Sequence, residues 1–196
     1  MNKSESKYYN TAILMDEALI RLLDKKDFEY ITIKEICDKA GVNRSTFYLH
    51  YETMNDLLEE TMEYVNRGFI EYMKANNIDV IKNINEQPKE NLYFITPTYL
   101  LPYLDYIKEN RRTYATVVKN RGLFRLDKTY EKMFDLFFIP ILDKFGIPEK
   151  QMLFTLAFYI NGLMAIISEW LKQDCSVPTA EIAEIMQNCI KTIDGK

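Results

Sequence analysis

Residues 32–51 read T-I-K-E-I-C-D-K-A-G-V-N-R-S-T-F-Y-L-H-Y, and they predict two short helices separated by a tight turn. Thr32 and Glu35 form the T-x-x-E pattern of a capping box, which predicts a helix start at Thr32. Gly41 can adopt the positive φ that ends this helix. Asn43 can then cap the second helix, in which Phe47 is the expected buried anchor. Because so short a helix is unstable alone, we expect it to be held against a core with its outer face free.

That outer face is predicted to carry hydrogen-bonding side chains. Arg44, Ser45, Thr46 and Tyr48 follow the cap directly. Such groups suit DNA phosphates and the base edges of the major groove. The pattern therefore indicates a helix-turn-helix whose second helix reads DNA.

The same residues, continued as E-T-M-N-D-L-L, resemble the N-terminal helix-turn-helix of the TetR family of bacterial transcriptional regulators. The resemblance covers about residues 8–62. It implies a ligand-responsive regulator, most often a repressor that leaves a palindromic operator on double-stranded DNA when a small-molecule effector binds. A long helix beginning near Thr53 would transmit the ligand signal. Met54 departs from the family, in which lysine is common, and this removes one expected phosphate contact.

The residues expected at the DNA combine the outward positions of the motif with the positions that the resemblance implies. His50 is included because the family often brings this position close to the DNA backbone. The predicted DNA-binding residues are Thr32, Lys34, Asn43, Arg44, Ser45, Thr46, Tyr48, His50 and Thr53.

Beyond the motif, the 196-residue chain has few glycines and prolines and long amphipathic patterns, which predict an all-α fold. Helices are expected at residues 8–26, 98–109, 112–120, 126–145 and 150–172, and from 178 onward. We expect a three-helix DNA-binding domain at residues 1–52. A helical-bundle effector-binding and dimerisation domain would follow at 53–196, with the helix from Thr53 joining the two.

Residues 150–172 are apolar on more than one helix face, so this helix is expected to be buried on two sides. Together with the last helix, it is predicted to pair with a second copy in a four-helix interface. The expected homodimer contacts are Leu156, Ile160, Leu163, Ile167, Trp170, Ile182, Ile185, Met186 and Cys189.

Aromatic residues are frequent between the motif and the last two helices, where the resemblance places a small-molecule pocket. Tyr103, Tyr106, Phe134 and Phe137 are the predicted effector contacts. The alternative is that these rings are ordinary core residues.

The charge pattern leaves a second hypothesis open. The net charge is -4, and residues 1–51 carry eight basic and eight acidic side chains. DNA binding must therefore rest on where Lys34, Lys39 and Arg44 project, not on bulk charge. The alternative is an interaction protein with a TetR-like fold that has lost specific DNA binding.

A helical enzyme is a third hypothesis, and no motif supports it. The sequence contains no phosphate-binding glycine loop and no G-x-S-x-G elbow. His50 is the only histidine and lacks clustered partners, so we expect neither a metal nor a cofactor. Three unpaired cysteines suit a reduced cytoplasm. We expect no membrane-spanning segment and no signal peptide.

Overall fold

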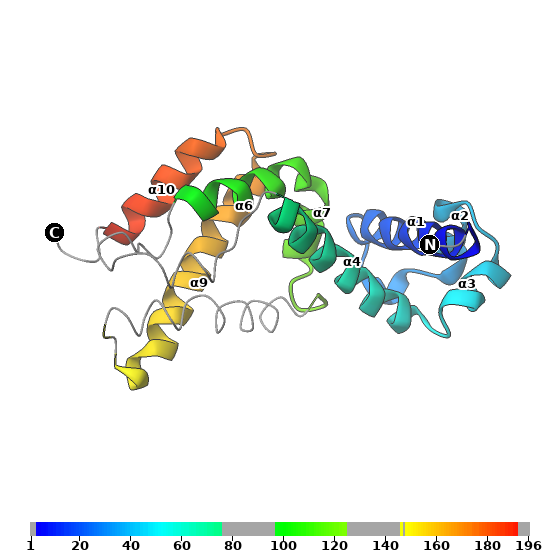
Figure 1. Ribbon diagram of the computed structural model, residues 1–196. Helices are drawn as coiled ribbons and strands as arrows, with labels where there is room; N and C mark the ends of the chain where they lie inside the picture. The colour runs from blue at the N-terminus through cyan, green and yellow to red at the C-terminus, as the bar shows by residue number, and fades with distance from the viewer. Residues whose placement is uncertain (1–2, 76–96, 125–145, 147, 192–196) are drawn as a thin grey trace. The chain divides into compact units, whose positions relative to one another are not determined.

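The computed structural model describes residues 3–75, 97–124, 146 and 148–191, and in these ranges it contains helices and turns but no β-strand (Figure 1). The predicted all-α fold is confirmed. The helix expected at 126–145 lies outside the described residues. Contacts divide the chain into two compact units, Met1–Glu71 and Tyr72–Lys196. The division therefore falls inside the long fourth helix and not at its start.

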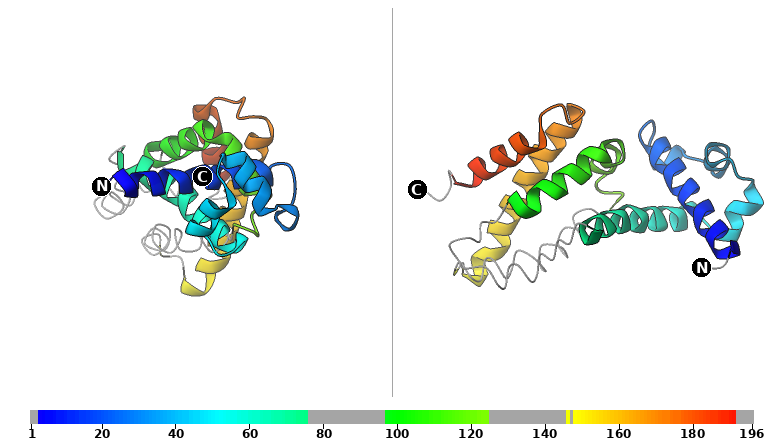
Figure 2. Two further views of the ribbon diagram at one scale, coloured as in Figure 1. Left: turned by 90° about the vertical axis from the view of Figure 1, so that its right-hand side faces the viewer. Right: turned by 45° about the horizontal axis from the view of Figure 1, so that its top comes forward.

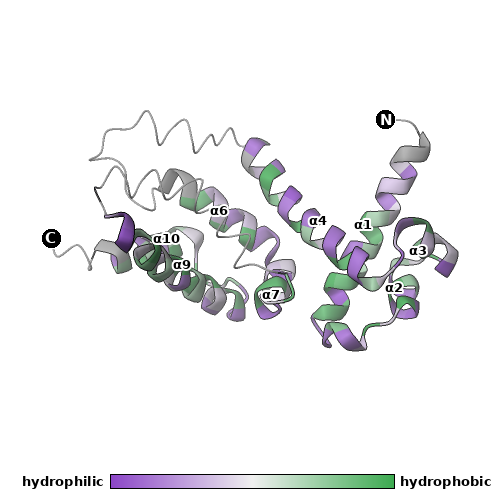
Figure 3. Ribbon diagram, turned by 90° about the horizontal axis from the view of Figure 1, so that it is seen from below, coloured by the Kyte–Doolittle hydropathy of each residue, from purple (hydrophilic) through white to green (hydrophobic). Residues whose placement is uncertain are grey.

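The first unit is built from four helices and one short 3-10 turn. They are α1 (Lys3–Leu23), the 3-10 turn (Phe28–Tyr30), α2 (Ile33–Ala40), α3 (Arg44–His50) and most of α4 (Met54–Ala75). The four α-helices all contribute to one core, in which these side chains are at most 1% exposed: Met15, Leu19, Leu23, Ile36, Phe47 and Leu57. Hydrophobic and hydrophilic bands alternate along α4 in Figure 3, as expected of a helix with one buried face.

The first helix begins and ends earlier than the sequence predicted. We expected residues 8–26, but α1 spans Lys3–Leu23. After the helix, the backbone N–H of Lys26 bonds to the Leu22 carbonyl at 3.1 Å. The Lys26 amine then forms an ion pair with the Glu35 carboxylate. Lys26 therefore ties the end of α1 to α2 instead of extending the helix.

The second unit contains α6 (Pro97–Glu109), α7 (Arg111–Lys119), α9 (Glu149–Lys172) and α10 (Thr179–Lys191). Helix α10 packs against α6 and α9, and α7 packs against α9 (Figures 1 and 2). The turn between α9 and α10 is closed by Trp170, which is 2% exposed and donates its indole N–H to the Val177 carbonyl at 2.9 Å. An ion pair of 2.7 Å between Arg111 and Asp174 ties α7 to the same turn.

The expectation that α9 is buried on two sides is wrong for its N-terminal half within one chain. Leu153, Phe154 and Phe158 are 73%, 80% and 60% exposed. Among the described side chains of α9, the buried ones begin only at Tyr159. The apolar pattern predicted burial, but it could not tell burial within the chain from burial against a partner.

The expectation that no stretch has the length and composition of a membrane-spanning segment is also wrong. Helix α9 is long and apolar enough to cross a membrane, and residues 151–168 contain no Asp, Glu, Lys or Arg. The core helix of a soluble protein meets the same criterion. In its C-terminal half α9 contributes to the core of the second unit, because Ile167 and Trp170 are at most 2% exposed.

Candidate nucleic-acid interface

The turn between α2 and α3 forms through the caps that the sequence predicted. The Thr32 hydroxyl accepts the Glu35 N–H at 3.3 Å, and the Glu35 carboxylate accepts the Thr32 N–H at 3.0 Å. Gly41 adopts φ 71° and ψ 30°, the left-handed conformation expected of it. Asn43 Oδ1 accepts the Thr46 N–H at 2.7 Å and caps α3. Local sequence signals therefore determine the path between the two helices.

Helix α3 is supported along its inner side. Phe47 is fully buried, and Tyr51, directly after the helix, is 3% exposed. The His50 ring stacks on the ring of Tyr8 from α1, with centroids 3.8 Å apart. The Tyr8 hydroxyl also donates to the Leu49 carbonyl at 3.5 Å. These contacts hold α3 from behind and leave its outer side free.

Three exposed cations belong to the two helices of the motif, two on α2 and one on α3. Lys34, Lys39 and Arg44 are exposed, and none of the ion pairs in the described part of the chain involves them. Glu35 of α2, in contrast, does not act as a free anion. Hydrogen bonds from Lys26 and Thr32 lower the pKa of Glu35 to about 2, and its charge is paired with that of Lys26. Lys34, Lys39 and Arg44 therefore keep their positive charge without an ion-pair partner in the described part of the chain.

The polar side chains at the start of α3 converge on the capping residue. The hydroxyls of Ser45 and Thr46 lie 2.6 Å and 2.8 Å from Asn43 Oδ1. That oxygen has two lone pairs and already accepts the Thr46 N–H, so only one hydroxyl can donate to it at a time. The Asn43 side-chain nitrogen makes no hydrogen bond to any described residue. One hydroxyl and this amide nitrogen thus remain available to DNA.

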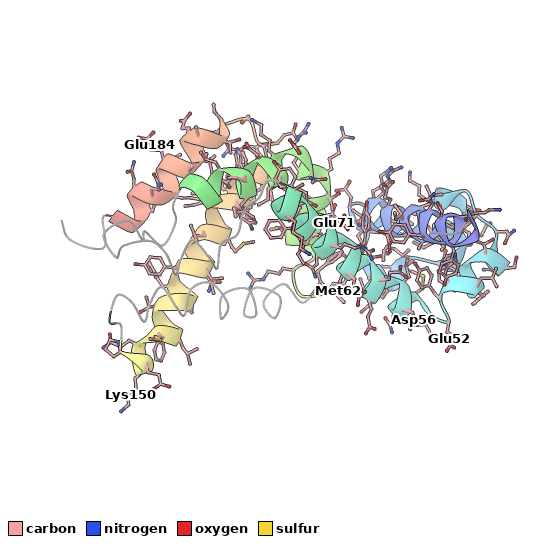
Figure 4. The ribbon with its side chains drawn as sticks, in the orientation of Figure 1. Glu52, Asp56, Met62, Glu71, Lys150 and Glu184 are labelled. Carbon is pink, nitrogen blue, oxygen red and sulfur yellow. The ribbon has the colours of Figure 1, made fainter. Side chains whose placement is uncertain are left out.

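The two threonines predicted to contact phosphate are both engaged in helix caps. Thr32 donates its hydroxyl proton to Glu35 at 2.8 Å. At the start of α4, labelled by Glu52 and Asp56 in Figure 4, the Asp56 carboxylate accepts the N–H groups of Glu52 at 3.0 Å and of Thr53 at 2.8 Å. This carboxylate therefore satisfies the two backbone N–H groups that directly precede α4. A phosphate contact by Thr53 stays a prediction; its hydroxyl accepts the Asp56 N–H at 3.3 Å and keeps its own proton for donation.

Three further residues differ in what they offer to DNA. Tyr48 is 57% exposed and free to reach outward. His50 is half-buried, and desolvation lowers its pKa below the ordinary histidine value, which disfavours its charged form. Met54, where the resemblance led us to expect lysine, is half-buried at the first position of α4.

One residue of α3 was missed by the sequence reasoning. Leu49 is 75% exposed, the most exposed large hydrophobic side chain of the first unit among the described residues. It stands two positions after the buried Phe47, which places it about 200° around the helix. Counting about 100° per residue from the buried Phe47 identifies Leu49 as an outward position from the sequence alone. A search for hydrogen-bond donors does not, because leucine has none.

The predicted effector contacts are partly described. Tyr103 and Tyr106 are half-buried on α6. The Tyr106 ring lies 4.8 Å from that of Tyr72 and 5.7 Å from that of Tyr114, centroid to centroid. Phe134 and Phe137 lie outside the described residues.

Several predicted dimer contacts belong to the core of a single chain. Ile167, Trp170, Ile182 and Met186 are at most 5% exposed, because the apolar side of α10 packs against α6 and α9. The others differ in exposure: Ile160 and Leu163 are half-buried, Ile185 and Cys189 are exposed, and the side chain of Leu156 lies outside the described residues. Among the described residues of the second unit, the exposed large hydrophobic side chains are Leu153, Phe154, Phe158 and Ile185.

Comparison with known families matches both parts of the chain. Residues 17–61 match the sequence model described as bacterial regulatory proteins, tetR family. Residues 96–192 match the model described as the transcriptional regulator C-terminal region of the same family. The first match contains α2, α3 and the turn between them.

Similar proteins point the same way. The HTH-type transcriptional regulator YxbF of Bacillus subtilis is 27% identical over 86% of this chain, and YerO of the same organism is 34% identical over 47%. These matches span only 41% and 28% of the two relatives, so the chain covers less than half of their length. Among solved structures, a TetR transcriptional regulator from Streptococcus agalactiae has a TM-score of 0.61 at 22% identity, covering 95% of this chain and 97% of the other. A TetR-like regulator from Rhodococcus has a TM-score of 0.65 at 13% identity with the same coverage.

Proposed function

Because this chain belongs to the TetR family of bacterial transcriptional regulators, we propose that it is a repressor that binds a palindromic operator as a homodimer and releases it when a small-molecule effector binds. One observation carries the proposal. The outer face of α2, the turn and α3 presents unpaired cations and free hydrogen-bonding groups on a support that is buried from behind. An interaction protein that had lost DNA binding has no need for this arrangement.

In the proposed complex, α3 enters the major groove. Arg44 and Tyr48 are four residues apart and share one side of the helix, so both can reach the same stretch of DNA. Lys34 and Lys39 on α2 are the phosphate contacts, which set orientation and salt dependence. Asn43, which directly precedes Arg44 in the chain, supplies a free amide nitrogen as a further donor.

The proposed dimer uses the exposed apolar residues of α9, with Lys150 marking the start of this helix in Figure 4. Phe154 and Phe158 are four residues apart, so they form one apolar ridge with Leu153 beside it. A patch of this kind on a monomer favours association. A two-fold dimer would place its two α3 helices in major grooves about 34–36 Å apart.

The effector is proposed to bind among the aromatic residues near Tyr103 and Tyr106 and to favour a dimer conformation that no longer matches the operator. We place the protein in the cytoplasm, where the DNA is. Its three free thiols, Cys37, Cys175 and Cys189, suit that reducing compartment.

The DNA contact is tested by replacing Arg44 with alanine. The probe is a duplex that wild-type protein enriches from a random library, and binding is followed by fluorescence anisotropy over a series of salt concentrations. If Arg44 reads a base, Arg44→Ala should cost about 1–3 kcal/mol and relax preference at one position of each half-site. If it contacts phosphate, affinity should fall on all sequences and the salt slope should shrink by about one per subunit.

Lys150→Ala is the matched control, because Lys150 is an exposed cation of the second unit. It should leave both affinity and salt slope unchanged. Enrichment of no sequence, together with an Arg44→Ala variant that binds like wild type at low salt, would rule out the regulator mechanism. The interaction protein with a TetR fold would then be the better account.

A further inference from the structure

We propose that Leu49 reads the methyl group of a thymine at one defined position in each operator half-site. This inference rests on the proposed function, since it requires α3 to lie in the major groove. It adds an apolar, sequence-reading contact to a surface so far described by its polar groups.

The first step is the position of Leu49 around the helix. Phe47 points into the core and is fully buried. Ser45 and Leu49 stand two residues to either side, about 200° around the helix, so they lie nearly opposite the core. Being four residues apart, they form the outermost ridge of α3. Arg44 and Tyr48 lie together on one side of this ridge, and any surface that meets α3 head-on meets Leu49.

The second step is the support behind Leu49. Its carbonyl accepts the Tyr8 hydroxyl at 3.5 Å, and the next residue, His50, stacks on the Tyr8 ring. The backbone at Leu49 is therefore held from α1 while the side chain stays 75% exposed. Because the backbone is already fixed, little backbone entropy is lost when a partner covers the Leu49 side chain.

The third step is the chemistry of the partner. A leucine side chain has no donor or acceptor, so it cannot read the polar pattern of base edges. The apolar group that base pairs present in the major groove is the C5-methyl group of thymine. Ser45, four residues earlier, is polar and can pair with a neighbouring base edge. The ridge thus combines one apolar and one polar contact.

The experiment replaces thymine by deoxyuridine, one position at a time, in the duplex that the wild-type protein enriches from a random library. This change removes only the methyl group and keeps base pairing. Wild-type protein should lose about fourfold in affinity at one position of each half-site, the effect of one buried methyl-sized group. Leu49→Ala should bind the thymine and deoxyuridine duplexes equally at that position. Leu49→Met, which stays apolar and long, should retain most of the discrimination.

Leu14→Ala is the control, because Leu14 is another exposed leucine of the first unit, at 48%. It should show the full wild-type loss on deoxyuridine. Equal binding by wild-type protein at every substituted position overturns the inference, and so does a loss that persists in Leu49→Ala, which assigns the methyl contact to another side chain such as Tyr48. In both cases an operator has been found and the proposed function stands. Failure to enrich any sequence removes the proposed function itself.

Discussion

Replacing Asp16 with asparagine should remove most of the pH dependence of the first unit's stability between about pH 5 and about pH 7. Asp16 lies on α1 and is fully buried. Its Oδ1 and the Leu57 carbonyl both lie 2.8 Å from the Thr61 hydroxyl of α4. Its Oδ2 is buried without a hydrogen-bond partner in the described part of the chain.

The hydrogen-bond pattern favours a protonated Asp16. A threonine hydroxyl has one proton. If Asp16 carries a proton, it can donate to Thr61 while Thr61 donates to Leu57, so both short contacts are hydrogen bonds. If Asp16 is ionised, two acceptors compete for one proton and a buried charge has no counterion in contact. Burial accordingly raises the pKa of Asp16 from 3.8 to about 7, against the lowering effect of the Thr61 hydrogen bond and with a smaller raising effect from Glu60.

The direction of the pH effect follows from the two pKa values. Above pH 3.8 the unfolded chain releases the Asp16 proton, whereas the folded chain keeps it until about pH 7. The folded state is therefore destabilised as pH rises through this interval and changes little above it. At about 1.4 kcal/mol per pH unit, the loss between about pH 5 and about pH 7 is roughly 2–3 kcal/mol.

The assay is urea unfolding of wild-type and Asp16→Asn protein at several pH values. The only tryptophan, Trp170, belongs to the second unit. The transition seen by far-UV circular dichroism but not by tryptophan fluorescence therefore reports the first unit. His50 is present in both proteins, and its lowered pKa acts in the opposite direction, so it cancels in the difference. Equal pH slopes for the two proteins would show that Asp16 is ionised in the fold and would refute this account.

Three further predictions concern the turn, the second unit's core and the dimer. Gly41→Val should reduce the free energy of unfolding by about 1–3 kcal/mol through backbone strain alone, since a Cβ at Gly41 meets nothing within 4 Å. It should also abolish DNA binding in the anisotropy assay. Gly122→Val should not, because Gly122 is equally uncrowded but is not at positive φ. Trp170→Phe should destabilise the second unit by about 0.5–1.5 kcal/mol, because the indole hydrogen bond that closes the α9–α10 turn is lost. An unchanged thermal unfolding transition would contradict that role. Phe154→Ser should shift a dimer toward monomer in light scattering while Leu14→Ser leaves it intact, and an unaffected dimer would place the interface elsewhere.

Local signals predicted the motif well. Thr32, Gly41, Asn43 and Phe47 do what the sequence indicated, because capping, positive φ and a single anchor depend on neighbours a few residues away. The end of α1 was misjudged because the partner of Lys26 is Glu35, on another helix. Such a tertiary ion pair leaves no trace in helical periodicity.

The second unit shows the limit of pattern reading more clearly. Trp170 and Phe154 lie on one apolar helix, yet one is 2% exposed and the other 80%. Helical periodicity predicts burial for both residues. It cannot tell burial by α10 from burial by a second copy, because both require apolar side chains. The predicted DNA-facing set was chosen for hydrogen-bonding side chains, so it did not include the exposed Leu49. Thr53 caps α4 together with Asp56, as its sequence position indicated, and its contact with DNA stays a prediction.

The central claim is that two copies of the α2–turn–α3 face bind one palindrome. Hydroxyl-radical footprinting of wild-type protein on its enriched duplex tests this directly. The account predicts two protected patches on one side of the duplex, related by two-fold symmetry and about 34–36 Å apart from centre to centre. It also predicts that Arg44→Ala weakens both patches together. A single patch, or uniform protection of every sequence offered, would contradict it.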